Sequence, residues 1–451
     1  MKMLAVLPLL LAFAPDPSGQ PSPKTYALTD VTVIDGTGSS PQPHRTVVIS
    51  GNRIAAIQPA EAQLDGTVER IDGKGKFLIP GLWDMHVHLA YMGDVACPAL
   101  IANGVTSVRD LGGGLEVIDW LRAEIAAVDL IGPRVYRSGP VVDGPKPGAR
   151  DRLVIDSTED GRRAVSFLKA RGVDFIKVHN GLQPEPYFAL LDEAKRQGIQ
   201  VVGHIPLSIM DPATAVDAGH RSVEHIVSLM EGPVYQKVKA GKSQEAAIAE
   251  FTDAEARRLA RTMVANAAWF DPTLVGYWAR ANQWDIRAQG DPRDRYVSAS
   301  GKEFWDTFPD LPDKPELRAL LARGFDRFLE ITRIQHQEGV RFLAGTDLAA
   351  KYVYPGFSLH DGLVWLNKAG LTPMEALIAG TRNCAESLGR LHELGTIEQG
   401  KLADLVLLDR NPLEDIRNTT RIAVVVANGR VFRRAELDNI LEQVAAAAPT
   451  R

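Results

Sequence analysis

The sequence predicts an α/β protein, in which a (β/α)8 TIM-like barrel is joined to a small β-sandwich domain formed from both chain ends. Two observations point to this fold class. The middle of the chain alternates short apolar strands with amphipathic helices, and both ends are rich in short β segments separated by turn residues. Of 451 residues, 45% are hydrophobic and 24% are charged. These proportions are typical of a globular protein with a large core.

The two ends of the chain are predicted to form β-strands. We expect residues 25–80 and 395–440 to be the two parts of the β-sandwich domain. The predicted strands are Tyr26–Ile34, Thr46–Ser50, Arg53–Ile57, Val68–Asp72, Ala403–Leu408, Ile422–Ala427 and Arg430–Arg433. Asn428-Gly429 predicts a hairpin turn between the last two. The alternative is two separate hairpins that pack on the middle domain. Residues 441–451 are expected to be a C-terminal tail.

The barrel is assigned to residues 81–394. Its eight predicted strands are Leu82–Leu89, Val105–Asp110, Arg134–Ser138, Phe175–Asn180, Gln200–His204, Arg221–Ile226, Trp269–Leu274 and Arg341–Thr346. A doubly wound open sheet is the alternative, and it usually carries a glycine-rich phosphate loop after its first strand. The run Gly112–Gly114 follows the second strand without the required spacing, so we interpret it as a turn.

The extreme N-terminus has a different character. Residues 1–14 hold one lysine and an apolar run that ends in Ala12-Phe13-Ala14, which is the pattern of a signal peptide. Residues 15–24 are rich in proline and serine and predict a disordered leader. We therefore expect export to the periplasm or the medium. The alternative is an apolar N-terminus without a targeting role.

Composition excludes several classes of protein. Lys and Arg number 51 and Asp and Glu 56, which gives a formal charge of −5 and disfavours a nucleic-acid partner. Two cysteines, Cys97 and Cys384, are too few for a disulfide scaffold or a cysteine-based zinc site. No apolar run approaches the roughly 20 residues of a membrane span. We expect a small-molecule substrate and leave a homo-oligomer open.

Candidate chemistry lies at the ends of the predicted barrel strands, where barrel enzymes hold their active sites. His86 and His88 are two residues apart on the first strand, so both imidazoles face the same way. His204 lies at the end of the fifth predicted strand and His225 at the end of the sixth, and Asp347 lies at the end of the eighth. Imidazole and carboxylate ligands suit Zn²⁺ or a similar transition metal.

Lys177 does not fit a simple set of metal ligands. It lies within Phe175-Ile176-Lys177-Val178-His179, so the pattern buries a lysine between β-branched neighbours and points it into the barrel mouth. An ammonium group has no lone pair for a metal and is repelled by one. Taken by itself, this lysine could pair with Asp347 or with a substrate carboxylate.

With this lysine included, the chain resembles the amidohydrolase superfamily in its binuclear, carboxylated-lysine subtype. The resemblance extends from Val31–Asp35 to Gly395–Asp404, and its sharpest motifs are Pro80–His88, Val223–His225 and Gly345–Asp347. Within the superfamily, Thr106–Gly113 and the Val223–His225 strand are similar to imidazolonepropionase-like proteins and prolidase-type metal-dependent dipeptidases. Imidazolonepropionase itself uses one metal and no bridging lysine, so Lys177 argues against its reaction.

The resemblance implies two divalent metal ions, of which Zn²⁺ is the first choice. His86, His88 and Asp347 would hold one ion, His204 and His225 the other, and a carbamylated Lys177 would bridge them. A metal-bridged hydroxide would then attack an amide-type C–N bond, with Asp347 moving the proton. The implied substrate is a dipeptide such as Xaa-Pro, an N-acyl amino acid or a cyclic amide. A lactonase, esterase-like or phosphotriesterase-like hydrolase and a non-catalytic binding protein are the alternatives.

Substrate contacts are less well marked in the sequence. Arg109 and Tyr136, near the ends of the second and third strands, are candidates to bind a substrate carboxylate. His179 lies two residues after Lys177, and His360 lies after the eighth strand, so both are candidate contacts. The long segment 276–314 is rich in aromatic residues, which predicts either a lid over the site or the core of an added helical subdomain.

Overall fold

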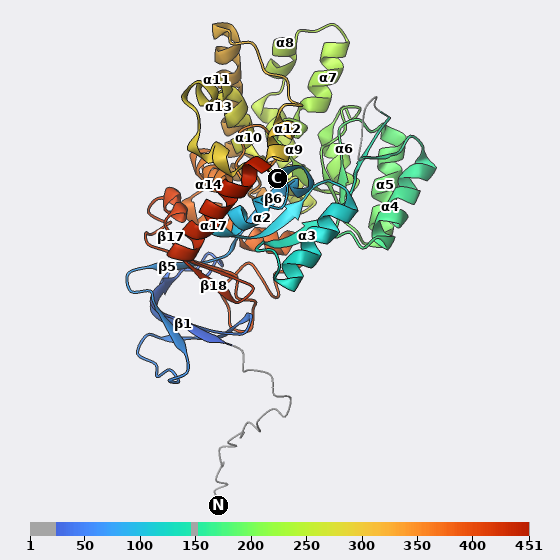
Figure 1. Cartoon of the computed structure of the whole chain (residues 1–451). Helices are drawn as coiled ribbons and strands as arrows, with labels where there is room; N and C mark the ends of the chain where they lie inside the picture. Colours follow the sequence, from blue (N-terminus) through green and yellow to red (C-terminus); the bar gives the residue numbers. More distant parts are fainter. Residues whose placement is uncertain (1–23, 146–151, 451) are drawn as a thin grey trace, which may run out of the picture.

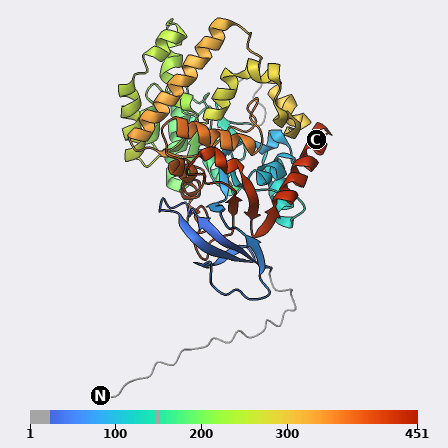
Figure 2. The ribbon, with the colours of Figure 1, turned by 90° about the vertical axis from the view of Figure 1, so that its left-hand side faces the viewer.

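A computed structural model describes residues 24–145 and 152–450 of the chain (Figures 1 and 2). The predicted signal peptide and all but the last residue of the predicted leader lie outside the described residues. In both views, a β-sheet formed from the two chain ends lies at one end of the molecule. The helices of the middle of the chain lie at the other end.

The two ends of the chain form one eight-stranded sheet. Its strands are β1 (Thr25–Val33), β2 (Gln42–Ser50), β3 (Arg53–Pro59), β4 (Glu69–Asp72), β5 (Phe77–Pro80), β16 (Leu405–Leu408), β17 (Ile422–Ala427) and β18 (Arg430–Arg433). The sheet order is β18-β17-β16-β5-β1-β2-β3, with β4 beside β1. Antiparallel pairing of β5 with β16 places Leu78 opposite Leu407 and joins the ends. Strands from both ends of the chain therefore belong to one sheet.

Apolar residues explain why these distant segments pair. Leu28, Val47, Ile49, Leu78 and Leu407 are buried together in one cluster. Neither end could bury these side chains alone, because each contributes only part of the sheet. The association of the two ends therefore follows from the burial of apolar surface.

The middle of the chain is an α/β domain in which the paired strands are parallel. One sheet contains β6 (Leu82–Val87), β7 (Val105–Asp110) and β8 (Arg134–Arg137). The other has the order β10-β9-β11-β12-β13-β14-β15, formed by β9 (Val141–Asp143), β10 (Arg152–Val154), β11 (Ile176–Val178), β12 (Val201–Gly203), β13 (His220–Glu224), β14 (Trp269–Asp271) and β15 (Arg341–Phe342). All eight predicted strands are present, most of them shorter than expected, and β9 and β10 are additional.

Backbone hydrogen bonds connect the two parallel sheets in two places. Beside the edge strands β6 and β15, the Met85 N–H donates to the Ala344 carbonyl at 3.0 Å and the His88 N–H donates to the Leu348 carbonyl at 2.9 Å. Beside β8, the N–H of Asp174, which precedes β11, donates to the Arg137 carbonyl at 2.9 Å. The first and last strands of the parallel series therefore lie side by side.

Helices alternate with these strands as the sequence predicts. Their bounds are α1 (Leu89–Met92), α2 (Ala96–Ala102), α3 (Leu115–Ala127), α4 (Thr158–Ala170), α5 (Pro184–Gln197), α6 (Pro212–Asp217), α7 (Glu231–Lys239), α8 (Gln244–Ala249), α9 (Asp253–Ala265), α10 (Leu274–Ala281), α11 (Gln283–Gln289), α12 (Ala299–Trp305), α13 (Pro315–Gln337), α14 (Phe357–Lys368), α15 (Pro373–Ala379), α16 (Arg382–Ser387) and α17 (Arg434–Ala447). Short 3₁₀ turns are η1 (Ile226–Leu229), η2 (Pro292–Tyr296), η3 (Ile416–Thr420) and η4 (Ala448–Thr450). Among the described helices, none combines the length and the apolar character needed to cross a membrane.

One segment differs from expectation, and a second agrees with one of the two alternatives given for it. The predicted C-terminal tail is largely helical, because α17 continues to Ala447 and packs against α2. Its buried residues Leu437, Ile440 and Val444 recur at helical spacing, which is the signal for this helix. The aromatic segment 276–314 forms most of α10, all of α11 and α12, and η2. Trp284 and Trp305 are buried in it, so part of it is the core of an added helical layer.

Candidate metal centre

The structure brings together the six side chains predicted as metal ligands. His86 lies on β6 and Lys177 on β11, His88, His204 and His225 directly follow β6, β12 and β13, and Asp347 follows β15. The imidazole of His225 lies between those of His86 and His204, with ring centroids 4.5 Å and 4.4 Å away. The His86 and His88 rings are 5.4 Å apart. Convergence follows from topology, since parallel strands end at the same edge.

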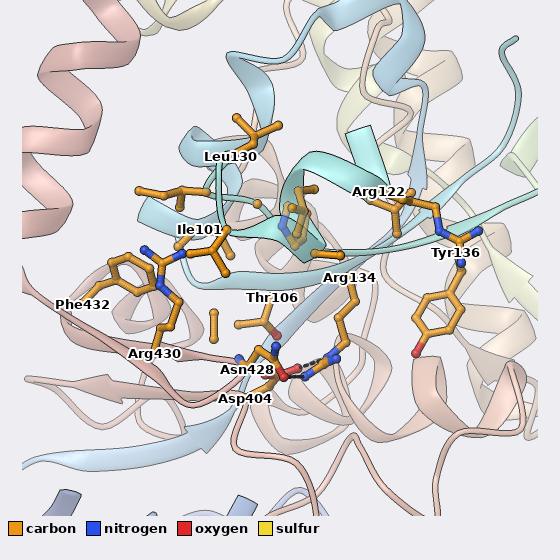
Figure 3. Close-up of a pocket in the computed structure, with 18 of the residues that line it drawn as sticks. Ile101, Thr106, Arg122, Leu130, Arg134, Tyr136, Asp404, Asn428, Arg430 and Phe432 are labelled. Carbon is orange, nitrogen blue, oxygen red and sulfur yellow. Dashed lines mark hydrogen bonds and ion pairs between the residues drawn. The ribbon is translucent and has the colours of Figure 1, made fainter. Parts of the chain in front are cut away.

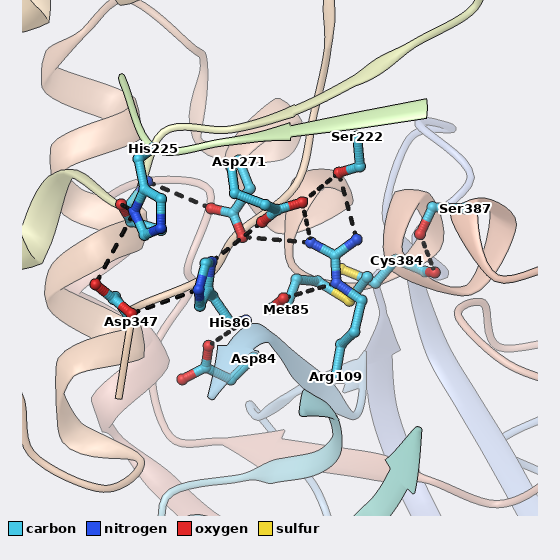
Figure 4. Close-up of polar contacts among 12 residues, drawn as sticks. Asp84, Met85, His86, Arg109, Ser222, His225, Asp271, Asp347, Cys384 and Ser387 are labelled. Carbon is cyan, nitrogen blue, oxygen red and sulfur yellow. Dashed lines mark hydrogen bonds and ion pairs between the residues drawn. The ribbon is translucent and has the colours of Figure 1, made fainter. Parts of the chain in front are cut away.

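Asp347 lies beside three of these imidazoles. Its Oδ1 is 3.4 Å from His86 Nε2 and 3.5 Å from His88 Nε2, and its Oδ2 is 3.9 Å from His225 Nδ1 (Figure 4). Asp84 holds this segment in place, because it accepts hydrogen bonds from the Thr346 N–H at 3.0 Å and the Thr346 hydroxyl at 2.7 Å. Asp84 and His86, which both belong to the motif Pro80–His88, therefore contribute to the same site.

Lys177 lies at the inner side of the cluster. It is 2% exposed, and its Nζ is 3.3 Å from His86 Nε2. The lysine stem passes over Gly203 on the neighbouring strand, where an added Cβ would lie 2.9 Å from Lys177 Cδ and 2.2 Å from the Val178 carbonyl oxygen. A glycine at this position leaves space for the lysine to reach the histidines.

The backbone is strained at two of the six residues. His225 has φ 68° and Asp347 has φ 64°, which is the left-handed region that L residues other than glycine rarely occupy. Such a conformation costs on the order of 1–3 kcal/mol and is typical of functional sites. At His225 the physical reason is clear. Strand alternation would place it on the face opposite Glu224, yet both side chains contact His86.

A buried polar network supports His86 from beneath. Glu224 Oε2 lies 3.2 Å from His86 Nδ1, while Glu224 Oε1 accepts hydrogen bonds from Arg109 at 2.6 Å and from the Ser222 hydroxyl at 2.5 Å (Figure 4). Arg109 also donates to the Met85 carbonyl at 2.8 Å. Arg109 and Glu224 are both almost completely buried. The charge of Arg109 is therefore used inside the domain, and its contact with substrate stays a prediction.

Burial favours the neutral form of the histidines that is needed for metal binding. It lowers the pKa of His86 and His225 well below the ordinary value and also lowers that of His204. The positive charge of Lys177 acts in the same direction on all three. A neutral imidazole has a free nitrogen lone pair for a metal ion at physiological pH.

The pKa values of the two charged members of the cluster, Lys177 and Asp347, are both lowered. Burial lowers the pKa of Lys177 to about 8, against the opposing charges of Glu224 and Asp347. Burial by itself would raise the pKa of Asp347. The neighbouring His225, the hydrogen bond and charge of His88, and the charge of Lys177 outweigh it and lower that pKa below its usual range. Asp347 is therefore a carboxylate, and part of the Lys177 population is a neutral amine near pH 8.

These residues fit a divalent metal ion. Ligand-type atoms of His86, His225 and Asp347 lie within 4.8 Å of one another, and His204 Nδ1 is buried without a hydrogen-bond partner. A second group of comparable spacing comprises His86, Glu224 and Asp271. Glu224 is already neutralised by Arg109, so the first group is the better metal site. Imidazole nitrogen and carboxylate oxygen are the donors that Zn²⁺ accepts.

The remaining predicted substrate contacts are distributed differently. The His179 ring lies 4.3 Å from the His204 ring and belongs to the cluster, and its substrate role stays a prediction. Tyr136 instead stacks on Trp83 at 5.4 Å and lines a separate cavity. His360 is buried on α14, where its ring nitrogens lie 2.9 Å from the Thr419 hydroxyl and 3.0 Å from the Asn103 carbonyl. The rings of Tyr136 and His360 are both engaged in packing, and their contacts with substrate stay predictions.

A cavity of about 360 Å³ opens beside Asp347. Tyr277, Phe308 and Tyr352 give it an aromatic lining, and Glu231 and Arg280 add charge. The aromatic segment therefore provides both core residues and cavity walls. Sequence reasoning did not identify Glu224, Glu231 or Arg280. Glu224 carried a usable signal, since it is a carboxylate directly before His225 at the end of a predicted strand. Arg280 is the single charged residue of α10, and no motif marks it.

Comparison with known proteins identifies the family. The family model described as "Amidohydrolase family" matches residues 77–432, which include all six clustered residues. The chain is 27% identical to ochratoxinase of Aspergillus niger over 429 residues, with 79% of this chain and 75% of that protein covered. It is 26% identical to imidazolonepropionase of Methylobacterium nodulans over 384 residues, covering 80% and 86%. The crystal structure of bottromycin amidohydrolase superposes with a TM-score of 0.78 at 24% identity, covering 96% and 94%. The chain belongs to the amidohydrolase family and is a hydrolase that acts on carbon–nitrogen bonds.

Proposed function

We propose that this protein is a binuclear metal-dependent hydrolase that cleaves the amide C–N bond of a small substrate bearing a carboxylate. A dipeptide or an N-acyl amino acid meets this description. The observation that carries the proposal is the convergence of His86, His88, His204, His225 and Asp347 around the buried Lys177. Edge contacts between the two parallel sheets support a closed (β/α)8 barrel that holds these residues at its mouth.

Lys177 would bridge the ions as a carbamate. Its neutral amine attacks CO2, the new N–C bond forms as one C–O π bond breaks, and one proton passes from the nitrogen to solvent, which converts a neutral amine into a carboxylate-like anion. The pKa of about 8 supports this step, because a neutral amine is available near physiological pH. His86, His88 and Asp347 would hold one ion, and His204 and His225 the other. When bound, the two ions supply an activated water and polarise the scissile carbonyl.

The protein's own groups then move the proton and position the substrate. Asp347 is ionised, so its carboxylate accepts the proton of the attacking water and returns it to the departing amine nitrogen. Glu224 holds His86 Nδ1, which leaves Nε2 directed at Lys177 and Asp347. The chemistry is the hydrolysis of an acyl–nitrogen bond.

The cavity beside Asp347 supports a substrate with a carboxylate. Within the described residues, the guanidinium group of Arg280 has no ion pair or side-chain hydrogen bond, and Arg280 lines the same cavity as Asp347. By contrast, Lys351 in that cavity is paired with Asp310 at 2.7 Å. A guanidinium group binds a carboxylate through two parallel hydrogen bonds. The aromatic walls would hold an apolar side chain of the substrate.

The test of the metal chemistry is the Lys177→Ala variant. We expect it to lose at least one metal per chain and nearly all amide hydrolysis, because the bridging anion is absent. A short carboxylic acid such as propionate should partly restore both. Lys177→Arg should not be rescued, since a guanidinium group stays charged and forms no carbamate. Full metal content in Lys177→Ala, measured by elemental analysis, would contradict the binuclear model.

The test of the substrate class is Arg280→Gln. For an N-acyl amino acid we expect KM to rise about tenfold with little change in kcat, because the lost interaction is made equally in ground and transition states. The matching N-acyl amino amide, which has no carboxylate, should be a poor substrate of both proteins. Lys351→Gln is the control cation. If the parent hydrolyses esters or phosphoesters but no amide, the same site performs the alternative reaction.

A further inference from the structure

A second cavity, of about 400 Å³, lies away from the metal centre, between the parallel α/β domain and the sheet of the chain ends (Figure 3). Thr106 and Arg134 line it from the first residues of β7 and β8, whereas His88 directly follows the last residue of β6. Parallel strands therefore carry the two sites at their opposite ends. The β17–β18 hairpin closes this cavity from the other side through Asn428 and Phe432.

The polar lining of this cavity is cationic. Four arginines and two aspartates line it, namely Arg122, Arg134, Arg390, Arg430, Asp174 and Asp404. Arg134 is compensated by Asp404 at 2.8 Å, and Arg390 pairs with Glu393. For Arg122 and Arg430, no acidic partner lies within ion-pair distance in the described part of the chain, and Arg122 is half-buried. Arg430 is exposed, and the exposed carboxylate of Asp174 offsets part of this charge, so the lining keeps a net positive charge.

Two further polar groups here have no partner. Thr106 is 1% exposed, lines the cavity, and its hydroxyl oxygen makes no hydrogen bond. Arg390 Nε is likewise buried without an acceptor. Buried polar groups in native proteins are almost always satisfied, and each exception requires an explanation such as a bound ligand or water. Both atoms are enclosed by protein, and the Thr106 hydroxyl lies against Gly81, so they belong to the packing behind the cavity wall.

Apolar side chains form the rest of the wall. Ile101, Ile125, Leu130 and Ile131 line the cavity together with Phe432 (Figure 3). Arg122 and Arg430 lie on opposite sides of the cavity, with Ile101 and Leu130 between them (Figure 3). A cavity that combines guanidinium groups with aliphatic side chains is complementary to an anion that carries an apolar body. We propose that this cavity is a binding site for an aliphatic carboxylate, distinct from the metal centre and independent of the proposed function.

Octanoate is a suitable probe, and octanol is its uncharged match. We expect saturable octanoate binding to the metal-loaded enzyme by isothermal titration, at least tenfold tighter than octanol. Arg122→Gln combined with Arg430→Gln should weaken it about tenfold or more, since each removes a charge-assisted contact. Ala126→Trp, at an exposed position on the cavity rim, should also weaken it by filling the space. Amide hydrolysis should be unchanged in these variants, because none of the three residues belongs to the metal centre.

The control separates this site from the cavity beside Asp347. If Arg280→Gln abolishes octanoate binding while the Arg122/Arg430 double variant keeps it, the anion binds at the metal-side cavity and the proposal is wrong. Equal affinity for octanoate and octanol would mean that the cavity binds only the apolar chain and does not recognise the carboxylate. Absence of saturable binding would mean that only water occupies the cavity. Either result would overturn the proposal.

Discussion

At the scale of single residues, His86 shows how much of the site depends on groups that never reach a metal ion. One of its nitrogens faces Lys177 and Asp347, and the other is held by Glu224. Glu224 in turn is neutralised by Arg109 and Ser222 inside the domain. Such partners set the tautomer and orientation of a histidine ligand.

We therefore expect Glu224→Gln to weaken metal binding by about 10–100-fold, because the partner of His86 Nδ1 is altered and Arg109 loses its counter-charge. Competition with a chelator of known affinity measures this directly. Glu116→Gln is a matched control, since the Glu116 side chain is 82% exposed and its only ion pair, with Arg171, lies at the surface. Unchanged metal affinity in Glu224→Gln would show that the network is purely structural.

At the scale of secondary-structure elements, short strands and the residues just beyond them place the chemistry. β12 ends at Gly203, and its neighbour β11 carries Lys177. Gly203 has φ 128°, which disfavours any side chain, and an added Cβ would meet the Val178 carbonyl oxygen at 2.2 Å. The end of this strand is therefore adapted to the lysine beside it.

Gly203→Ala should destabilise the protein by about 3 kcal/mol, through backbone strain and overpacking, and should lower the metal content by displacing Lys177. Gly324→Ala is the control, because Gly324 lies within α13 with nothing within 4 Å of an added Cβ. That change should be neutral or slightly stabilising. Denaturant unfolding together with metal analysis distinguishes the two. Similar unfolding midpoints for both variants would contradict this account of Gly203.

At the scale of the whole molecule, buried histidines outside the metal centre connect its layers. His360 on α14 contacts Thr419 of η3 and the Asn103 carbonyl after α2. His220 on β13 contacts the Tyr187 hydroxyl of α5 at 3.0 Å. Burial lowers the pKa of each to about 4, despite hydrogen bonds that favour the charged form.

These histidines should make the fold sensitive to acid. Between pH 6.5 and about 4 the unfolded chain binds protons that the folded chain does not, so stability falls as the pH decreases. Each histidine contributes at most about 3 kcal/mol to this loss. His360→Gln should be less stable than the parent at pH 7, with a difference that narrows towards pH 5. Thermal unfolding at both pH values measures it, and a constant difference would mean that His360 does not titrate as described.

Much of the architecture could be predicted from the sequence alone. Period-2 and helical patterns indicated the eight strands, the helices between them and the pairing of both chain ends, because these patterns report which faces are buried. Histidines and an aspartate directly after apolar strands indicated the metal centre, since parallel strands end at one edge. The motif resemblance added the bridging lysine, which residue chemistry alone would have treated as a charge partner.

What only the tertiary structure decided is which charges remain free. Arg109 and Arg280 look equivalent in the sequence, yet Arg109 is buried against Glu224 while Arg280 lines the cavity beside Asp347 unpaired. The left-handed backbone of His225, the helix that replaces the expected tail and the arginine-lined second cavity likewise arise from contacts between distant segments. Local patterns report the burial of an element's own face, whereas the partner of a charge depends on how whole elements pack.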